Sequence, residues 1–148
     1  MSVKKILITD DHPLLLIGLK GIIENIKGYR VVGAATNGTE ALKMASETQP
    51  DICFIDLELP GVNGMDVLKQ IKKNDRNCKV AILTSHKEEE LLISAIESGA
   101  DGYLLKDFAH TEIEKCLTQF VKNEPYYSSQ LRSYLNPAKK KDPAIDKL

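Results

Sequence analysis

Ile52-Cys53-Phe54-Ile55-Asp56 is a short apolar run that ends in a single carboxylate, and the turn-rich stretch Leu57–Gly64 follows it at once. Apolar runs of this length, rich in β-branched and aromatic residues, are typical of a strand that is covered on both faces of a sheet. The pattern therefore predicts a buried strand that presents Asp56 at its carboxyl edge.

Three other apolar segments end in polar residues of complementary chemistry. They are Ile6–Thr9 before Asp10-Asp11, Val80–Leu83 before Thr84-Ser85, and Tyr103–Leu105 before Lys106. If these strands are parallel in one sheet, their carboxyl ends meet at one edge. Carboxylates, a hydroxyl and an ammonium would converge there, and this combination suits a divalent cation and a phosphoryl group.

Strand and helix patterns alternate along the whole chain. The expected strands are Val3–Asp10, Arg30–Ala34, Ile52–Ile55, Lys79–Thr84 and Ala100–Leu105, and the expected helices are Pro13–Ile26, Thr39–Thr48, Met65–Asn74, Glu88–Ser98 and Glu112–Lys122. Strict alternation predicts a doubly wound, five-stranded parallel sheet with helices on both faces. In the order 2-1-3-4-5 the ligand crevice lies between the first and third strands, beside Asp10, Asp11 and Asp56.

Capping signals support these helix boundaries. The expected N-caps, each with an acid three residues on, are Asn37 with Glu40, Asn63 with Asp66, Ser85 with Glu88, and Thr111 with Glu114. Pro13 suits the first helical position, and Gly99 is the expected C-terminal cap after Ser98.

Composition points to an ordinary globular protein of 148 residues, with 43% hydrophobic and 28% charged residues. The net charge of −1 provides no bulk attraction to nucleic acid or to an anionic membrane. No apolar run reaches the roughly 18 residues of a spanning helix. Cys53, Cys78 and Cys116 are widely spaced, so we expect reduced thiols in a cytoplasmic protein, with Cys53 in the core.

The clustered acids indicate a magnesium site. Mg²⁺ usually takes one or two protein carboxylates together with water and phosphate oxygens. Asp11 and Asp56 are the expected direct ligands, while Asp10 would hold a metal-bound water. Two carboxylates about 4 Å apart repel each other by about 4 kcal/mol at an effective dielectric near 20, so a cation or Lys106 must offset the cluster.

The remaining edge residues suit phosphoryl chemistry. A carboxylate beside Mg²⁺ can attack the phosphorus of a donor and form an acyl phosphate, which gives Asp56 its expected role. Lys106 would neutralise phosphoryl oxygens, Thr84 would donate a hydrogen bond to one of them, and the small Ser85 would leave the phosphorus accessible. We expect His12 and His86 to flank the site as peripheral residues.

The segments Asp10-Asp11, Asp56–Gly64, Thr84-Ser85 and Gly102–Lys106 together resemble the receiver domain of bacterial two-component response regulators over about residues 3–122. The resemblance implies a flavodoxin-like fold and Mg²⁺-dependent phosphorylation of Asp56 by a sensor histidine kinase. It also implies that the backbone carbonyl of Glu58 binds the metal. Tyr103 would turn inward as Thr84 moves toward the phosphoryl group, and the expected consequence is homodimer formation.

One departure from the common receiver pattern narrows the resemblance. Asp107 follows the lysine where many receivers have proline, and this variant is most similar to the NarL/LuxR subgroup. We therefore expect residues 1–122 to form the receiver and residues 123–148 to lead to a helix-turn-helix DNA-binding domain outside this chain. Ser128–Leu135 could form a short helix, and Asn136–Pro143 has the composition of a tether. DNA would be bound only through that further domain, which would make the output transcription regulation.

Three alternatives remain. The first is a stand-alone receiver that serves as a phosphorelay or protein-interaction switch. The second is a Mg²⁺-dependent phosphatase acting through an aspartyl phosphate, which we disfavour because Asp10 and Asp11 are adjacent and the acceptor acid lies on the third strand. The third is a flavodoxin-like cofactor module, but Asp-Asp-His-Pro at residues 10–13 is no phosphate-binding loop. We therefore expect a switch and not an enzyme.

Overall fold

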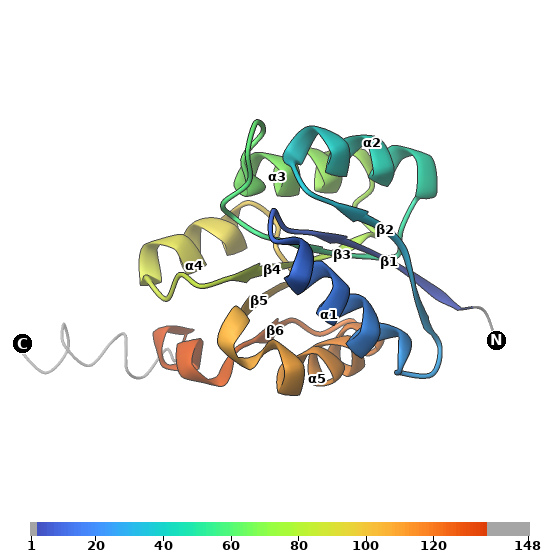
Figure 1. Cartoon of the computed structure of the whole chain (residues 1–148). Coiled ribbons are helices and arrows are strands. Elements are labelled where there is room, and N and C mark those ends of the chain that lie inside the picture. The colour runs from blue at the N-terminus through green and yellow to red at the C-terminus, as the bar shows by residue number, and fades with distance from the viewer. Residues whose placement is uncertain (1–2, 136–148) are drawn as a thin grey trace, which may run out of the picture.

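The computed structural model describes residues 3–135, which form one parallel sheet with helices on both sides (Figure 1). The strands are β1 Lys4–Thr9, β2 Tyr29–Ala35, β3 Ile52–Ile55, β4 Lys79–Thr84, β5 Gly102–Leu105 and β6 Tyr126–Tyr127. The α-helices are α1 Pro13–Glu24, α2 Gly38–Thr48, α3 Gly64–Asn74, α4 Glu89–Glu97 and α5 Ala109–Val121; two 3₁₀ helices cover Lys106–Phe108 and Ser129–Leu135. The order β2-β1-β3-β4-β5-β6 confirms the predicted doubly wound topology and adds one strand.

Two apolar layers cover the two faces of the sheet. Helices α1 and α5 bury residues such as Leu19 and Leu117 against one face. Helices α2, α3 and α4 bury Ala41, Leu68 and Leu92 against the other. The central strands are apolar throughout because both of their faces are covered, as the sequence predicted.

Side-chain caps fix two of the helix starts as expected. Asn37 accepts a hydrogen bond from the Glu40 N–H at 2.8 Å, and Asn63 accepts one from the Asp66 N–H at 3.0 Å. Pro13 begins α1, and Gly99 after α4 has a φ of +105°, a conformation that only glycine adopts without strain. These boundaries were therefore predicted for the right physical reasons.

Two of the expected caps are wrong. Helix α4 begins at Glu89 with Glu88 as its cap residue, so Ser85 lies in the preceding loop. Helix α5 begins at Ala109, because the 3₁₀ turn Lys106–Phe108 leads directly into it. Thr111 therefore lies inside the helix, where its hydroxyl donates to the Phe108 carbonyl at 3.0 Å.

The sheet continues past residue 122, which the sequence did not predict. Tyr126 and Tyr127 pair in parallel with Gly102 and Tyr103 of β5 and form β6. The short helix expected at Ser128–Leu135 is confirmed in position, as the 3₁₀ helix Ser129–Leu135. The expected tether Asn136–Pro143 lies outside the described residues.

All three cysteines are buried free thiols, and Cys53 is a core residue as expected. None of the helices within residues 3–135 is long and apolar enough to cross a membrane.

Candidate functional site at the sheet edge

The acids predicted to meet do so at the carboxyl edge of β1 and β3. The Asp56 N–H donates to the Thr9 carbonyl and the Asp10 N–H to the Ala35 carbonyl, each at 3.0 Å, so the ladder of the sheet holds both residues in place. Asp10 and Asp56 are 1% and 2% exposed, whereas Asp11 faces solvent. The site therefore combines two buried carboxylates with one accessible carboxylate.

Lys106 enters this cluster from the 3₁₀ turn after β5. Its Nζ lies 2.7 Å from Asp10 Oδ2 and 2.9 Å from Asp56 Oδ2. Burial works to raise the pKa of Asp10, but the Lys106 ammonium and the His12 hydrogen bonds outweigh it and lower that pKa. For Asp56 burial prevails over Lys106, so its pKa is raised. Burial opposes the charge of Lys106, yet its two carboxylate partners raise its pKa overall.

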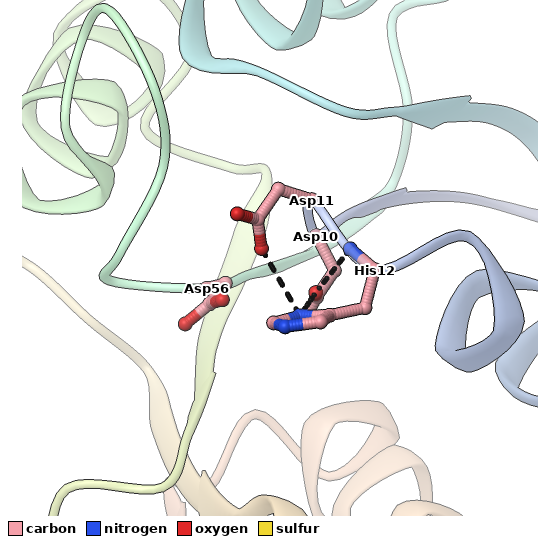
Figure 2. A group of neighbouring side chains, drawn as sticks. All are labelled: Asp10, Asp11, His12 and Asp56. Carbon is pink, nitrogen blue, oxygen red and sulfur yellow. Dashed lines mark hydrogen bonds and ion pairs between the residues drawn. The ribbon is translucent and has the colours of Figure 1, made fainter.

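His12 flanks the acidic cluster on its solvent-exposed side, as the sequence indicated, and also contacts two of the acids directly. Its Nδ1 is 2.7 Å from Asp10 Oδ1 and 3.0 Å from Asp11 Oδ1 (Figure 2). The hydrogen bond to Asp10 raises the pKa of His12, and the charges of both aspartates act in the same direction. Its place directly after two acids at a strand end was the signal that could have identified this contact.

The loop between β3 and α3 packs tightly against the backbone of Asp56. The Glu58 N–H donates to Asp56 Oδ1 at 3.2 Å, and the Gly64 N–H donates to the Leu57 carbonyl at 3.0 Å. A Cβ on Gly64 would lie 2.0 Å from the Asp56 carbonyl oxygen. This position therefore requires glycine, because the start of α3 touches the backbone of Asp56.

The ends of β4 and β5 place the remaining predicted residues. Thr84 is fully buried and its Oγ accepts from the His86 N–H at 3.2 Å, while Ser85 is exposed. Tyr103 is also fully buried, and its hydroxyl donates to the His86 carbonyl at 3.0 Å. The loop after β4 is thus tied to both Thr84 and Tyr103.

A second histidine borders the site on the exposed side. His86 forms an ion pair with Glu58 across the loops after β3 and β4, and its Nδ1 lies 3.2 Å from Glu88. The hydrogen bond to Glu58 raises the pKa of His86, in spite of an opposing contribution from burial. The structure therefore places His86 at the flank of the site, as the sequence predicted.

The donor set suits a hard divalent cation. One ligand atom each from Asp10, Asp11, His12 and Asp56 lies within 4.8 Å of the others. Three carboxylates face the single Lys106 ammonium, so negative charge is in excess when His12 is neutral. Oxygen donors with excess negative charge are what Mg²⁺ prefers in proteins.

Comparison with known proteins agrees with this geometry. Residues 6–118 match the response regulator receiver domain family. The chain belongs to that family. It is 35% identical over 130 residues to the nitrate/nitrite response regulator protein NarL of Escherichia coli K12, a match that covers 88% of this chain and 60% of NarL. It is 45% identical over 103 residues to the transcriptional regulatory protein YdfI of Bacillus subtilis, covering 70% and 48% of the two chains.

Solved structures place the receiver in the same subgroup. A LuxR-family two-component response regulator from Aurantimonas superposes with a TM-score of 0.86 at 29% identity, covering 97% of this chain and 99% of that one. The receiver domain of the response regulator NarL from Mycobacterium tuberculosis gives 0.79 at 29% identity, covering 84% and 100%. The protein is thus a NarL/LuxR-type receiver with a flavodoxin-like fold. The chain spans about 60% of the length of NarL.

Proposed function

We propose that this receiver accepts a phosphoryl group on Asp56 and converts it into a change of conformation. The observation that carries the proposal is the position of Asp56. It is a buried carboxylate at the end of a central strand, with the Lys106 ammonium 2.9 Å away and the exposed Asp11 in the same cluster. A nucleophile held beside positive charge, next to an open acidic ligand, suits phosphoryl transfer.

Mg²⁺ is the proposed cofactor, and three groups of this chain would bind it. They are the carboxylates of Asp11 and Asp56 and the backbone carbonyl of Glu58, while Asp10 would hold a metal-bound water. The bound cation would supply positive charge for the phosphoryl oxygens. The excess of carboxylates over ammonium groups at this edge supports the assignment.

In the proposed transfer an Asp56 carboxylate oxygen forms a bond to phosphorus. The bond between phosphorus and the donor breaks, and the donor leaves with the bonding electron pair. Lys106 would pair with a phosphoryl oxygen, and Thr84 would donate its hydroxyl to another once it turns from the His86 N–H. The small Ser85 would leave the phosphorus accessible.

Tyr103 would change its packing when Thr84 moves. Its hydroxyl donates to the His86 carbonyl, and the His86 N–H donates to Thr84. A movement of Thr84 that shifts His86 would therefore change how the Tyr103 ring packs. A phosphoryl group adds about 1.5 to 2 negative charges at pH 7 and new acceptor oxygens. We propose that the two arrangements differ in self-association, with a homodimer favoured after phosphorylation.

Membership of the receiver family supports a proposal for the partners. We propose a sensor histidine kinase as the phosphoryl donor and a helix-turn-helix domain beyond residues 123–148 as the output, so that the protein regulates transcription from the cytoplasm. The names of NarL and YdfI, a response regulator and a transcriptional regulatory protein, support this output. On this proposal the receiver is a switch and not an enzyme.

Acetyl phosphate provides a direct test without the kinase. The purified chain is incubated with acetyl phosphate and Mg²⁺ and its intact mass is measured. We expect the added mass of one phosphoryl group, and no addition after Mg²⁺ is chelated, because Asp10 and Asp11 alone would repel the donor. Equal phosphorylation with and without the metal would contradict the magnesium assignment, and none in any condition would contradict the proposed function.

A further inference from the structure

A buried glutamate on α5 has no part in the site described above. Glu112 lies in the first turn of α5 and is only 6% exposed. A carboxylate in such a position costs free energy unless its oxygens accept hydrogen bonds. Its hydrogen-bond donors therefore indicate what it does.

The hydrogen-bond donors to this carboxylate belong to residues 126–135, the C-terminal segment of the described chain. The Tyr126 hydroxyl and the Ser129 N–H each donate to Glu112 Oε2 at 3.2 Å. The Ser128 hydroxyl donates to Oε1. Glu112 thus holds the segment against α5 through three residues, Tyr126, Ser128 and Ser129.

Ser128 connects this carboxylate to β5. Its Oγ accepts from the Leu105 N–H at 2.9 Å, and its backbone N–H donates to the Tyr103 carbonyl at 3.0 Å. Leu105 immediately precedes Lys106, and Tyr103 is the buried aromatic of the proposed switch. The C-terminal segment is therefore hydrogen-bonded to β5, the strand that contains Tyr103 and leads directly into Lys106.

The same segment packs on the face that contains α4. Leu131 is 2% exposed and belongs to the apolar cluster that contains Tyr103, Leu105 and Leu92 of α4. Tyr134 packs against that cluster as a partly buried residue. The segment therefore has a polar contact with the Tyr103 backbone and an apolar residue, Leu131, in the same cluster as the Tyr103 side chain.

We infer that Glu112 is a positioning residue that docks the C-terminal segment on β5, and that this docking is coupled to phosphoryl binding at Asp56. The inference rests on the proposed function, since it requires Asp56 to be the switch. The docked segment pairs with β5 while Tyr103 is buried. Because Ser128 donates to the Tyr103 carbonyl, a ligand that stabilises the buried Tyr103 would also favour docking of the segment.

Coupling of this kind is reciprocal. If binding at Asp56 strengthens docking by some factor, docking strengthens binding at Asp56 by the same factor. The proposed downstream domain is reached through this segment. Its docking would therefore carry the phosphorylation state from Tyr103 and Lys106 to the output.

The first experiment follows the segment in the full chain without any substitution. Hydrogen exchange is measured for residues 126–135 with Mg²⁺ alone and with Mg²⁺ and beryllofluoride, whose fluorides stand in for phosphoryl oxygens. We expect exchange in the segment to slow by about fivefold, the lower end of ordinary coupling strengths. Exchange that is unchanged while beryllofluoride is bound would overturn the inference and leave the proposed function standing.

The second experiment separates coupling from a merely structural role. The test variants are Ser128→Ala and Glu112→Gln, which remove or weaken the hydrogen bond between these two side chains. The control variants are Ser129→Ala and Glu114→Gln, which change exposed neighbouring side chains and keep the Ser129 N–H. We expect the first pair to bind beryllofluoride about fivefold more weakly and the control pair to match the unmodified protein. A structural role alone would lower stability without changing this affinity.

Two further outcomes complete the test. If Ser128→Ala or Glu112→Gln does not fold, Tyr126→Phe removes a single hydroxyl contact with Glu112, and an unchanged affinity in that variant would overturn the inference. If the unmodified protein does not bind beryllofluoride at all, the proposed function fails and the coupling fails with it.

Discussion

Lys106 Nζ lies 2.9 Å from Asp56 Oδ2, although the two residues are 50 positions apart in the sequence. The contact exists because parallel strands bring their carboxyl ends to one edge. Asp10 shares the same ammonium at 2.7 Å, so a single cation balances two buried carboxylates. A phosphoryl group on Asp56 would compete for this cation, which makes the pair a natural point for a switch.

Lys106→Ala should uncouple phosphorylation from the conformational change. The variant keeps the acids and should still bind Mg²⁺, but no ammonium would pair with the phosphoryl oxygen. Loss of the buried ion pair should also lower the free energy of unfolding by about 3 kcal/mol without the metal. NMR shifts on adding beryllofluoride measure the response, with the exposed Lys87→Ala as the control. Equal shifts in the unmodified protein and the Lys106 variant would argue against this role.

Thr84→Ala should be phosphorylated yet poorly activated. The hydroxyl that would reach the phosphoryl oxygen is missing, and the His86 N–H loses its acceptor, which costs about 1 kcal/mol of stability. Size-exclusion chromatography and the NMR signals of Tyr103 give the readout, with and without beryllofluoride. Ser85→Ala is the matched control, because it stays small and is exposed. A full response in the Thr84 variant would remove this residue from the mechanism.

Gly64→Ala should distort the loop that carries the acceptor. The added Cβ would lie 2.0 Å from the Asp56 carbonyl oxygen and 2.6 Å from Leu57 Cα, and backbone atoms cannot move aside cheaply. We expect the free energy of unfolding to fall by about 2–3 kcal/mol in chemical denaturation, and phosphorylation to slow. The control is Gly21→Ala in α1, where nothing lies within 4 Å and alanine should be neutral or stabilising. Equal stability of the two variants would contradict the packing described here.

Stability at high pH should depend on Tyr126. Burial, together with the nearby Glu112, raises the pKa of Tyr126 from 10.0 to about 12. A raised folded-state pKa gives stability that is complete below pH 10 and is lost as the pH rises toward 12, because the unfolded chain releases its proton first. Denaturation between pH 9 and 12 should show a shallower decline for Tyr126→Phe, and parallel curves would refute the assignment.

The sequence predicted most of the fold because its signals were local and mutually consistent. Strands such as β3 and β4 are apolar on both faces, and Asn37 and Asn63 cap their helices through contacts three residues away. The site could be predicted because Asp10, Asp56 and Lys106 each end a recognisable strand, and parallel topology brings such ends together. Their proximity needed no knowledge of side-chain packing.

What the sequence did not predict depends on contacts between distant segments. Strand β6 has only two residues and no period of its own, so its existence depends on the free edge of β5. Thr111 carried a capping pattern, but the turn at Lys106–Phe108 started α5 earlier. Glu112 did leave a signal, since it occupies the buried stripe of Cys116 and Phe120 at helical spacing.

Chemical mapping of the phosphorylated residue tests the central proposal most directly. After reaction with acetyl phosphate and Mg²⁺, borohydride reduces an aspartyl phosphate to homoserine, and peptide mass spectrometry locates the change. We predict the reduced residue at position 56 alone, and none in Asp56→Asn. A reduced residue at Asp10 or Asp11 instead, or undiminished labelling of the Asn variant, would contradict the assignment of Asp56 as the phosphoryl acceptor.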